Sequence, residues 1–147
     1  MGRTLDTNQY LDAVCRMLED GATTVPVPVT GVSMRPFLRA GDFVYVELPG
    51  EKIRKGDILL FQRPNGQYIL HRVVKFRKDG YLMLGDSQLE REPIQADWVR
   101  AKAVSARIQG QVVAPGSFRW WMFSYPWRWL SPWRRQIGWL HNHLWKK

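Results

Sequence analysis

The sequence predicts a mainly β protein: a small antiparallel β domain with an N-terminal amphipathic helix and a helical C-terminal tail rich in tryptophan and arginine. Short runs of β-branched and aromatic residues follow one another between residues 25 and 113. Asn65-Gly66 and Asp79-Gly80 separate such runs, and both dipeptides are typical of tight hairpin turns. A length of 147 residues fits one domain with a single core.

The first predicted element is an amphipathic helix over about residues 6–19. Its apolar residues recur at helical spacing, and Gly21 is suited to end it. These apolar residues are Leu11, Val14, Cys15 and Leu18. Cys15 is the single cysteine, so it forms no disulfide within the chain and belongs to no paired-cysteine metal motif. We expect it to be a buried helix residue in a reducing compartment.

The β domain is predicted to begin directly after this helix. Pro26 and Pro28 exclude a helix and favour an edge strand, because proline has no N–H to donate to a neighbouring strand. Further strands are expected within residues 42–48, 56–64, 67–77, 81–86, 97–108 and 110–114.

The positive charge is concentrated in residues 117–147. The formal net charge of the chain is +9, and this segment holds six basic residues, no acidic residue and seven of the eight tryptophans. Ser131 and Pro132 are suited to begin a helix there. Its apolar side would carry Trp133, Ile137, Leu140 and Leu144, opposite Arg134, Arg135 and Lys146. The N-terminus lacks the apolar region of a signal peptide, and no run of about 18–20 apolar residues could span a membrane.

Four short motifs occur in order along the predicted β domain. The first is Gly-Val-Ser-Met-Arg-Pro-Phe-Leu, residues 31–38, which contains Ser33. The others are Gly56-Asp57, His71-Arg72 and Gly85-Asp86. Each is weak alone, because Gly-Asp pairs are common in turns and a single histidine on a strand is more often structural. Their order and spacing together are informative.

The ordered set resembles the signal peptidase I family of serine peptidases, whose clan includes the self-cleaving repressors of the bacterial DNA-damage response. The resemblance covers about residues 25–110, and it implies that Ser33 is the nucleophile. Residue 71 is histidine where bacterial signal peptidases and the repressors have lysine, so the chain resembles the endoplasmic-reticulum and archaeal branch. That branch implies Asp86 as the acid of the site. A second family acid matches Glu92, which has a longer side chain.

These residue types suit hydrolysis of a peptide bond. A serine hydroxyl is a weak nucleophile until a base removes its proton, and histidine can do so near neutral pH. A carboxylate orients the imidazole and stabilises its protonated form. We therefore expect Ser33 as the nucleophile, His71 as the general base and then acid, and Asp86 as the group that orients the ring. No cofactor and no metal are expected.

One departure from the family concerns the oxyanion of the tetrahedral intermediate. Family members often have a hydroxyl residue two positions before the nucleophile, where this chain has Gly31. Loss of one such donor costs about 100- to 1,000-fold in rate. The Ser33 N–H is one remaining donor and Thr30 is a neighbouring candidate, and a catalytically inactive relative stays an alternative.

The predicted function is a serine endopeptidase that cleaves a leader or signal segment of a precursor protein at a membrane surface, with the peptide added as a strand to the sheet. The predicted division is an N-terminal helix (1–24), a catalytic β domain (25–116) and a cationic tail (117–147).

The tail is expected to hold the protein on a membrane as a peripheral protein, with the cytoplasmic face as the default. Two other interpretations of the tail stay open, tryptophans packed on the β domain and, less favoured, nucleic-acid binding. The alternative function is an inactive peptide- or membrane-surface-binding module on the same fold. A repressor would add a DNA-binding domain and a lysine base. The oligomeric state is left open.

Overall fold

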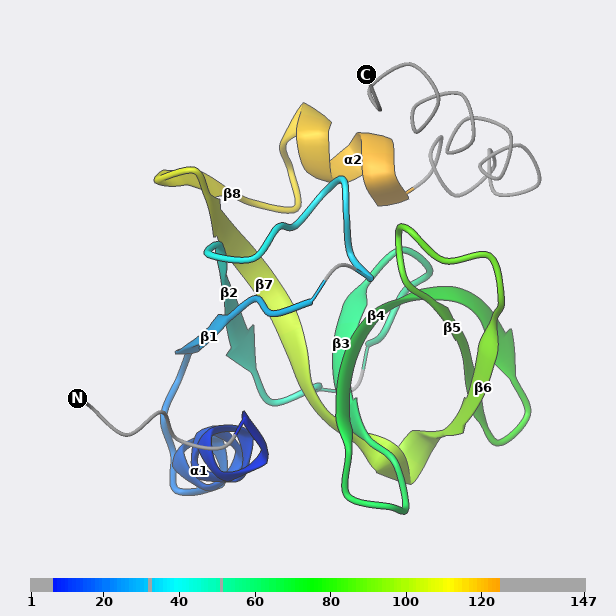
Figure 1. Cartoon of the computed structure of the whole chain (residues 1–147). Coiled ribbons are helices and arrows are strands. Elements are labelled where there is room, and N and C mark those ends of the chain that lie inside the picture. The colour runs from blue at the N-terminus through cyan, green and yellow to red at the C-terminus, as the bar shows by residue number, and fades with distance from the viewer. Residues whose placement is uncertain (1–6, 32, 51, 125–147) are drawn as a thin grey trace.

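The structure is a computed structural model of the whole chain, and it describes residues 7–31, 33–50 and 52–124 (Figure 1). Helix α1 spans Thr7–Glu19, the 3-10 helix η1 spans Ala96–Trp98, and helix α2 spans Phe118–Ser124. The strands are β1 (Val25–Pro28), β2 (Phe43–Glu47), β3 (Ile58–Gln62), β4 (Tyr68–Arg77), β5 (Gly80–Leu84), β6 (Glu92–Gln95), β7 (Val99–Ile108) and β8 (Gln111–Val113). The helix predicted over residues 131–147 lies outside the described residues.

The strands form one antiparallel sheet in the order β1-β2-β7-β3-β4-β5-β6, and β8 pairs with β7. This confirms the predicted mainly β, antiparallel fold class. Among the described strands β1 pairs with β2 alone, so the strand that contains Pro26 and Pro28 is an edge strand, as predicted. Strands β3 to β6 curl into a nearly closed ring, which Figure 1 shows in green.

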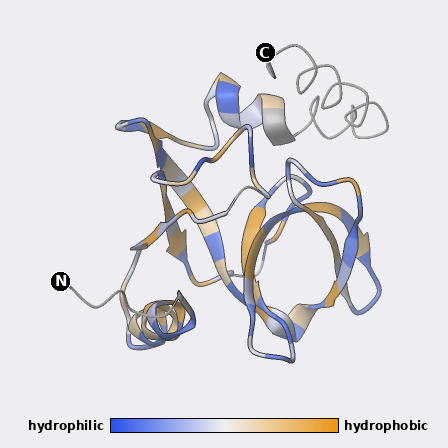
Figure 2. Cartoon of the chain, in the orientation of Figure 1, coloured by the Kyte–Doolittle hydropathy of each residue, from blue (hydrophilic) through white to orange (hydrophobic). Residues whose placement is uncertain are grey.

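The two faces of the sheet bury separate apolar clusters. The larger cluster joins α1, β1, β2, β3, β7 and the segment after β1, and it includes Val14, Phe37 and Leu60. The smaller cluster lies inside the ring of β3 to β6 and is formed by Leu59, Phe61, Val73, Met83 and Ile94. Figure 2 shows hydrophobic residues along the strands and hydrophilic residues at the outer turns. We call the surface that carries the smaller cluster the inner face of the ring.

Helix α1 packs on the edge of the sheet through the residues that its periodicity predicts. Leu11, Val14 and Leu18 are buried, and so is Cys15. The Tyr10 hydroxyl donates to the Pro26 carbonyl at 2.9 Å. A second link runs from the Tyr68 hydroxyl to Asp12 Oδ1 at 2.5 Å. Burial raises the pKa of the Cys15 thiol, which agrees with its expected role as a buried helix residue.

The start of the predicted tail belongs in part to the folded domain. Trp120 of α2 is buried, and its ring meets Phe37 edge-on with the centroids 5.4 Å apart. On the same helix Phe118 and Trp121 are 72% and 50% exposed, with their centroids 5.8 Å apart. The described part of the chain contains no helix with the length and apolar character needed to cross a bilayer.

Candidate active site

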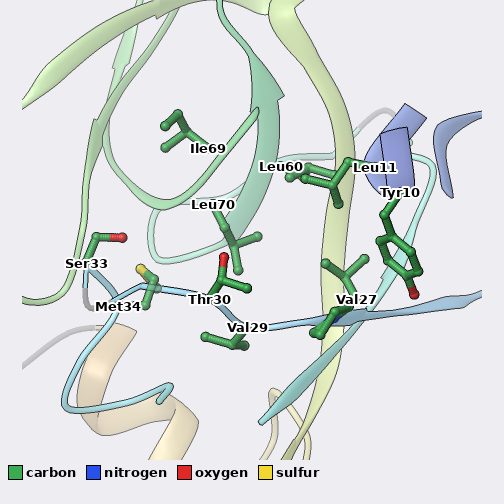
Figure 3. Close-up of a pocket in the computed structure, with 11 residues that line it drawn as sticks. Tyr10, Leu11, Val27, Val29, Thr30, Ser33, Met34, Leu60, Ile69 and Leu70 are labelled. Atoms are coloured by element: carbon green, nitrogen blue, oxygen red, sulfur yellow. The ribbon is translucent and has the colours of Figure 1, made fainter. Parts of the chain in front are cut away.

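Ser33 lies in the segment between β1 and β2, at one end of an apolar cleft. The cleft has a volume of about 370 Å³. Figure 3 shows the Ser33 side chain at one end of the cleft and Tyr10 of α1 at the other. Residues from α1, β1, β3 and β4 line the cleft between them, and they include Val27, Leu60 and Leu70. A half-buried hydroxyl that borders an apolar cleft is placed to meet a bound chain.

The turn that contains the fourth motif contacts the Ser33 backbone. The Ser87 N–H donates to the Ser33 carbonyl at 2.9 Å. Gly85 lies so close that a Cβ atom added to it would stand 2.6 Å from the same carbonyl oxygen. Only glycine therefore fits at position 85 without displacing the Ser33 backbone, which explains why the fourth motif needs glycine there.

Arg72 is the residue at which all four motifs meet. Its Nε and Nη2 each donate to the Asp86 carboxylate at 2.8 Å, and its Nη1 donates to the Gly56 carbonyl at 2.8 Å. Its guanidinium carbon lies 5.1 Å from the centre of the Phe37 ring. Arg72 and Asp86 are both almost fully buried. A bidentate pair with this geometry fixes the Gly85-Asp86 turn, which contacts the Ser33 backbone.

The structure therefore gives Asp86 a different partner from the one that the sequence led us to expect. Both Asp86 carboxylate oxygens bond Arg72, and no described residue bonds His71 Nδ1. The reason is the alternation of a β-strand, which sends the side chains of His71 and Arg72 to opposite faces. In this structure Arg72 fixes Asp86 in the turn that contacts Ser33, and the predicted action of Asp86 on the His71 ring stays a prediction.

His71 lies on the inner face of the ring and is 4% exposed. The Phe61 ring stands edge-on to it with the centroids 6.1 Å apart. Burial lowers the pKa of His71 to about 4, while Glu92 acts to raise that pKa and Arg63 to lower it. The imidazole is therefore neutral at neutral pH, which is the form that can accept a proton.

In the part of the chain that the structure describes, no hydrogen bond joins Ser33 to His71, and His71 Nδ1 is buried without any partner. His71 does not line the cleft, although Ile69 and Leu70, which do, directly precede it on β4. Catalytic hydrogen bonds are often long or absent before substrate binds.

The backbone at Gly31 explains the missing hydroxyl side chain two positions before Ser33. Gly31 has φ of 76°, in the left-handed region that favours glycine, so a serine or threonine there would be strained. Thr30 is exposed and lines the same cleft as Ser33, as Figure 3 shows. It is the described side-chain hydroxyl nearest to Ser33 in sequence.

Two charged residues act on His71 from its own face, and sequence reasoning misses Arg63 and its pairing with Glu92. Arg63 follows β3, and it forms a salt bridge with Glu92 at the start of β6. The family resemblance points to Glu92 only by position, and nothing in the sequence pairs it with Arg63. The described residues contain no cluster of three histidine, cysteine or acidic side chains that could hold a metal ion.

In this antiparallel β domain Ser33 borders the cleft, the turn at residues 85–87 contacts the Ser33 backbone, and Arg72 bonds Asp86 of that turn. This arrangement fits a serine-type peptidase of the clan described above. Comparison with known families agrees. The model of the Peptidase S24-like family matches residues 3–113, and the chain belongs to this family. No curated protein and no solved structure matches the chain.

Proposed function

We propose that this chain is an endopeptidase in which Ser33 attacks the peptide carbonyl and His71 is the general base. The observation that carries the proposal is the cleft, which Ser33 lines together with Ile69 and Leu70, the two residues before His71 on β4. The apolar lining and the membership of a serine peptidase family support the same function.

The chemistry requires few groups. The Ser33 hydroxyl oxygen forms a bond to the substrate carbonyl carbon while its proton passes to His71. Collapse of the tetrahedral intermediate breaks the peptide bond, and His71 returns that proton to the leaving amine. Water then releases the acyl group from Ser33 by the same steps in reverse. The Ser33 N–H and the Thr30 hydroxyl are the proposed donors to the oxyanion.

The part of the β1 edge beyond the Tyr10–Pro26 hydrogen bond supports binding of an extended peptide. The Val29 N–H donates to the Asp42 carbonyl at 2.8 Å, so the backbone groups of Val29 point toward β2. The backbone groups of its neighbours Pro28 and Thr30 therefore point away from β2. Pro28 lacks an N–H and offers only its carbonyl, whereas Thr30 offers both groups. A substrate strand along this edge can therefore donate to Pro28 and pair fully with Thr30.

We propose further that the substrate is a leader or signal segment and that cleavage takes place at a membrane surface. The exposed pair of Phe118 and Trp121 supports this, because aromatic rings favour the headgroup region of a bilayer. The basic residues of the segment 117–147 would add attraction to anionic lipids. Trp120 is the exception, since it packs on the domain.

A peptide assay tests the proposed function. The full chain is incubated with a mixture of apolar, extended peptides, and products are followed by mass spectrometry. Hydrolysis is expected with the unchanged chain and with the control Ser105→Ala, because Ser105 does not line the cleft. Ser33→Ala is expected to bind peptide without cleaving it. Peptide binding with no cleavage by the unchanged chain would favour the inactive binding module.

A further inference from the structure

Three ionisable groups lie together on the inner face of the ring. Leu59 pairs with His71, so Leu59, Phe61 and Arg63 alternate onto the face that His71 shares with Val73. Val73 pairs with Met83, and Met83 pairs with Glu92. Glu92 thus lies two strands across and two residues along from His71. The spacings of a sheet place their Cα atoms no more than about 12 Å apart, and less where the sheet curls.

Arg63 holds the Glu92 carboxylate at both oxygens. Its Nε donates to Oε2 at 2.8 Å and its Nη2 donates to Oε1 at 2.6 Å. Nη1 of the same guanidinium donates to the Gln67 side-chain oxygen at 2.7 Å. Hydrogen bonds to Glu92 and Gln67 therefore fix the guanidinium, and the Glu92 carboxylate points toward Arg63.

His71 lacks the partner that such a carboxylate could supply. Its Nδ1 is buried, and no described residue donates to it or accepts from it. A buried polar atom without a partner is costly, so the ring gains whenever an acceptor comes within reach. The remaining side chains on this face are apolar or aromatic: Ile53, Leu59, Phe61, Ile69, Val73, Tyr81, Met83, Ile94, Trp98 and Val99. Glu92 and Arg63 are the two charged groups that act on the ring.

We propose that Arg63 is a positioning residue that holds Glu92 away from His71 and thereby sets the basicity of the catalytic imidazole. While Arg63 binds both oxygens, its positive charge opposes that of Glu92 at the ring and the carboxylate does not orient the imidazole. Release of Glu92 lets it accept from Nδ1–H, which strengthens His71 as a base. The inference rests on the proposed role of His71, but its central measurement needs no substrate.

The experiment is an NMR titration of His71 in the full chain, with the resonance assigned by comparison with His71→Gln. The variants are Arg63→Met, Glu92→Gln and the double variant. The pKa of His71 is expected to be low in the unchanged chain and to rise in Arg63→Met. Loss of the arginine charge alone also raises the pKa, so the decisive quantity is the shift that R63M causes in the E92Q background.

The proposal predicts that this shift is clearly smaller without Glu92 than with it. Equal shifts in both backgrounds would mean that Arg63 acts only through its own charge. No shift in either background would mean that Arg63 does not affect His71. Either result overturns the proposal. Both side chains are partly exposed, so the variants should fold, and a thermal melt checks this.

Arg63→Lys separates the geometry of the guanidinium from its charge. Lysine keeps the charge but cannot form the bidentate pair. For Arg63→Lys the proposal predicts a His71 pKa between that of the unchanged chain and that of Arg63→Met. A pKa equal to that of the unchanged chain would contradict the proposal. In peptide hydrolysis, R63M should raise kcat/KM near neutral pH and move its acidic limb upward, and E92Q should cancel both effects. If Ser33 catalysis fails but the titration behaves as stated, the proposed function is wrong and the positioning role of Arg63 stands.

Discussion

The buried imidazole of His71 makes the stability of the domain depend on pH in a way that can be calculated. Burial lowers the pKa of His71 from 6.5 to about 4 in the folded protein. The unfolded chain therefore binds more protons than the folded one between these two values. The stabilising contribution is present above pH 6.5 and is lost as the pH falls toward 4.

The size of the effect follows from the shift. One pKa unit corresponds to 1.36 kcal/mol, so a shift from 6.5 to about 4 corresponds to about 3 kcal/mol in total. The linkage relation places about 2 kcal/mol of this loss between pH 7 and pH 5. His71→Gln removes this part of the pH dependence, because glutamine does not titrate.

The assay is urea unfolding of the full chain and of H71Q at pH 7, 6 and 5. Other acids titrate in both proteins, so the difference between the two free energies of unfolding isolates His71. We expect the advantage of the unchanged chain over H71Q to shrink by about 2 kcal/mol from pH 7 to pH 5. A difference that stays constant over this range would show that His71 titrates normally, and the described burial of the ring would be wrong.

Three further predictions address Asp86, the Ser33 and His71 pair, and the two tryptophans of α2. Asp86→Asn should lower the free energy of unfolding by about 3–5 kcal/mol, because it leaves a buried guanidinium without its charge partner, and a loss below about 1 kcal/mol would contradict this. In peptide hydrolysis, Ser33→Ala with His71→Gln should be little slower than either single variant, whereas additive losses would argue against a shared mechanism. Trp120→Ala should cost about 3–5 kcal/mol in unfolding experiments. Trp121→Ala should change stability by less than about 0.5 kcal/mol but weaken binding to anionic vesicles, and equal effects of the two changes would refute the described orientation of α2.

The elements that the sequence predicts well are those fixed by local patterns. Helix α1 follows from the spacing of Leu11, Val14 and Leu18, and the β3–β4 hairpin follows from Asn65-Gly66. The edge position of β1 follows from its prolines, because an inner strand would need the missing N–H groups.

The parts that the sequence does not predict depend on partners far along the chain. Strand β6 has four residues, contains Pro93 and, among the described strands, pairs with β5 alone, so no local pattern distinguishes it from a loop. Helix α2 falls within the predicted tail and is fixed by the contact of Trp120 with Phe37.

In the candidate site, too, local patterns predict the residues but not their distant partners. The motif order predicts Ser33, His71 and Asp86 as site residues, but the partner of Asp86 depends on which face of β4 each side chain takes. The Arg63–Glu92 pair joins residues that are 29 positions apart, and it needs the register of four strands to form. Sequence patterns name residue types, whereas cross-strand register decides which charges meet.

Trapping of the acyl intermediate tests the central claim most directly. The full chain is mixed with an apolar peptide ester, quenched in acid and analysed by intact mass and peptide mapping. The account predicts an acyl group on Ser33, no adduct and no turnover with Ser33→Ala, and slower acylation with His71→Gln. Turnover that persists in Ser33→Ala, or an acyl group on any other residue, would contradict it.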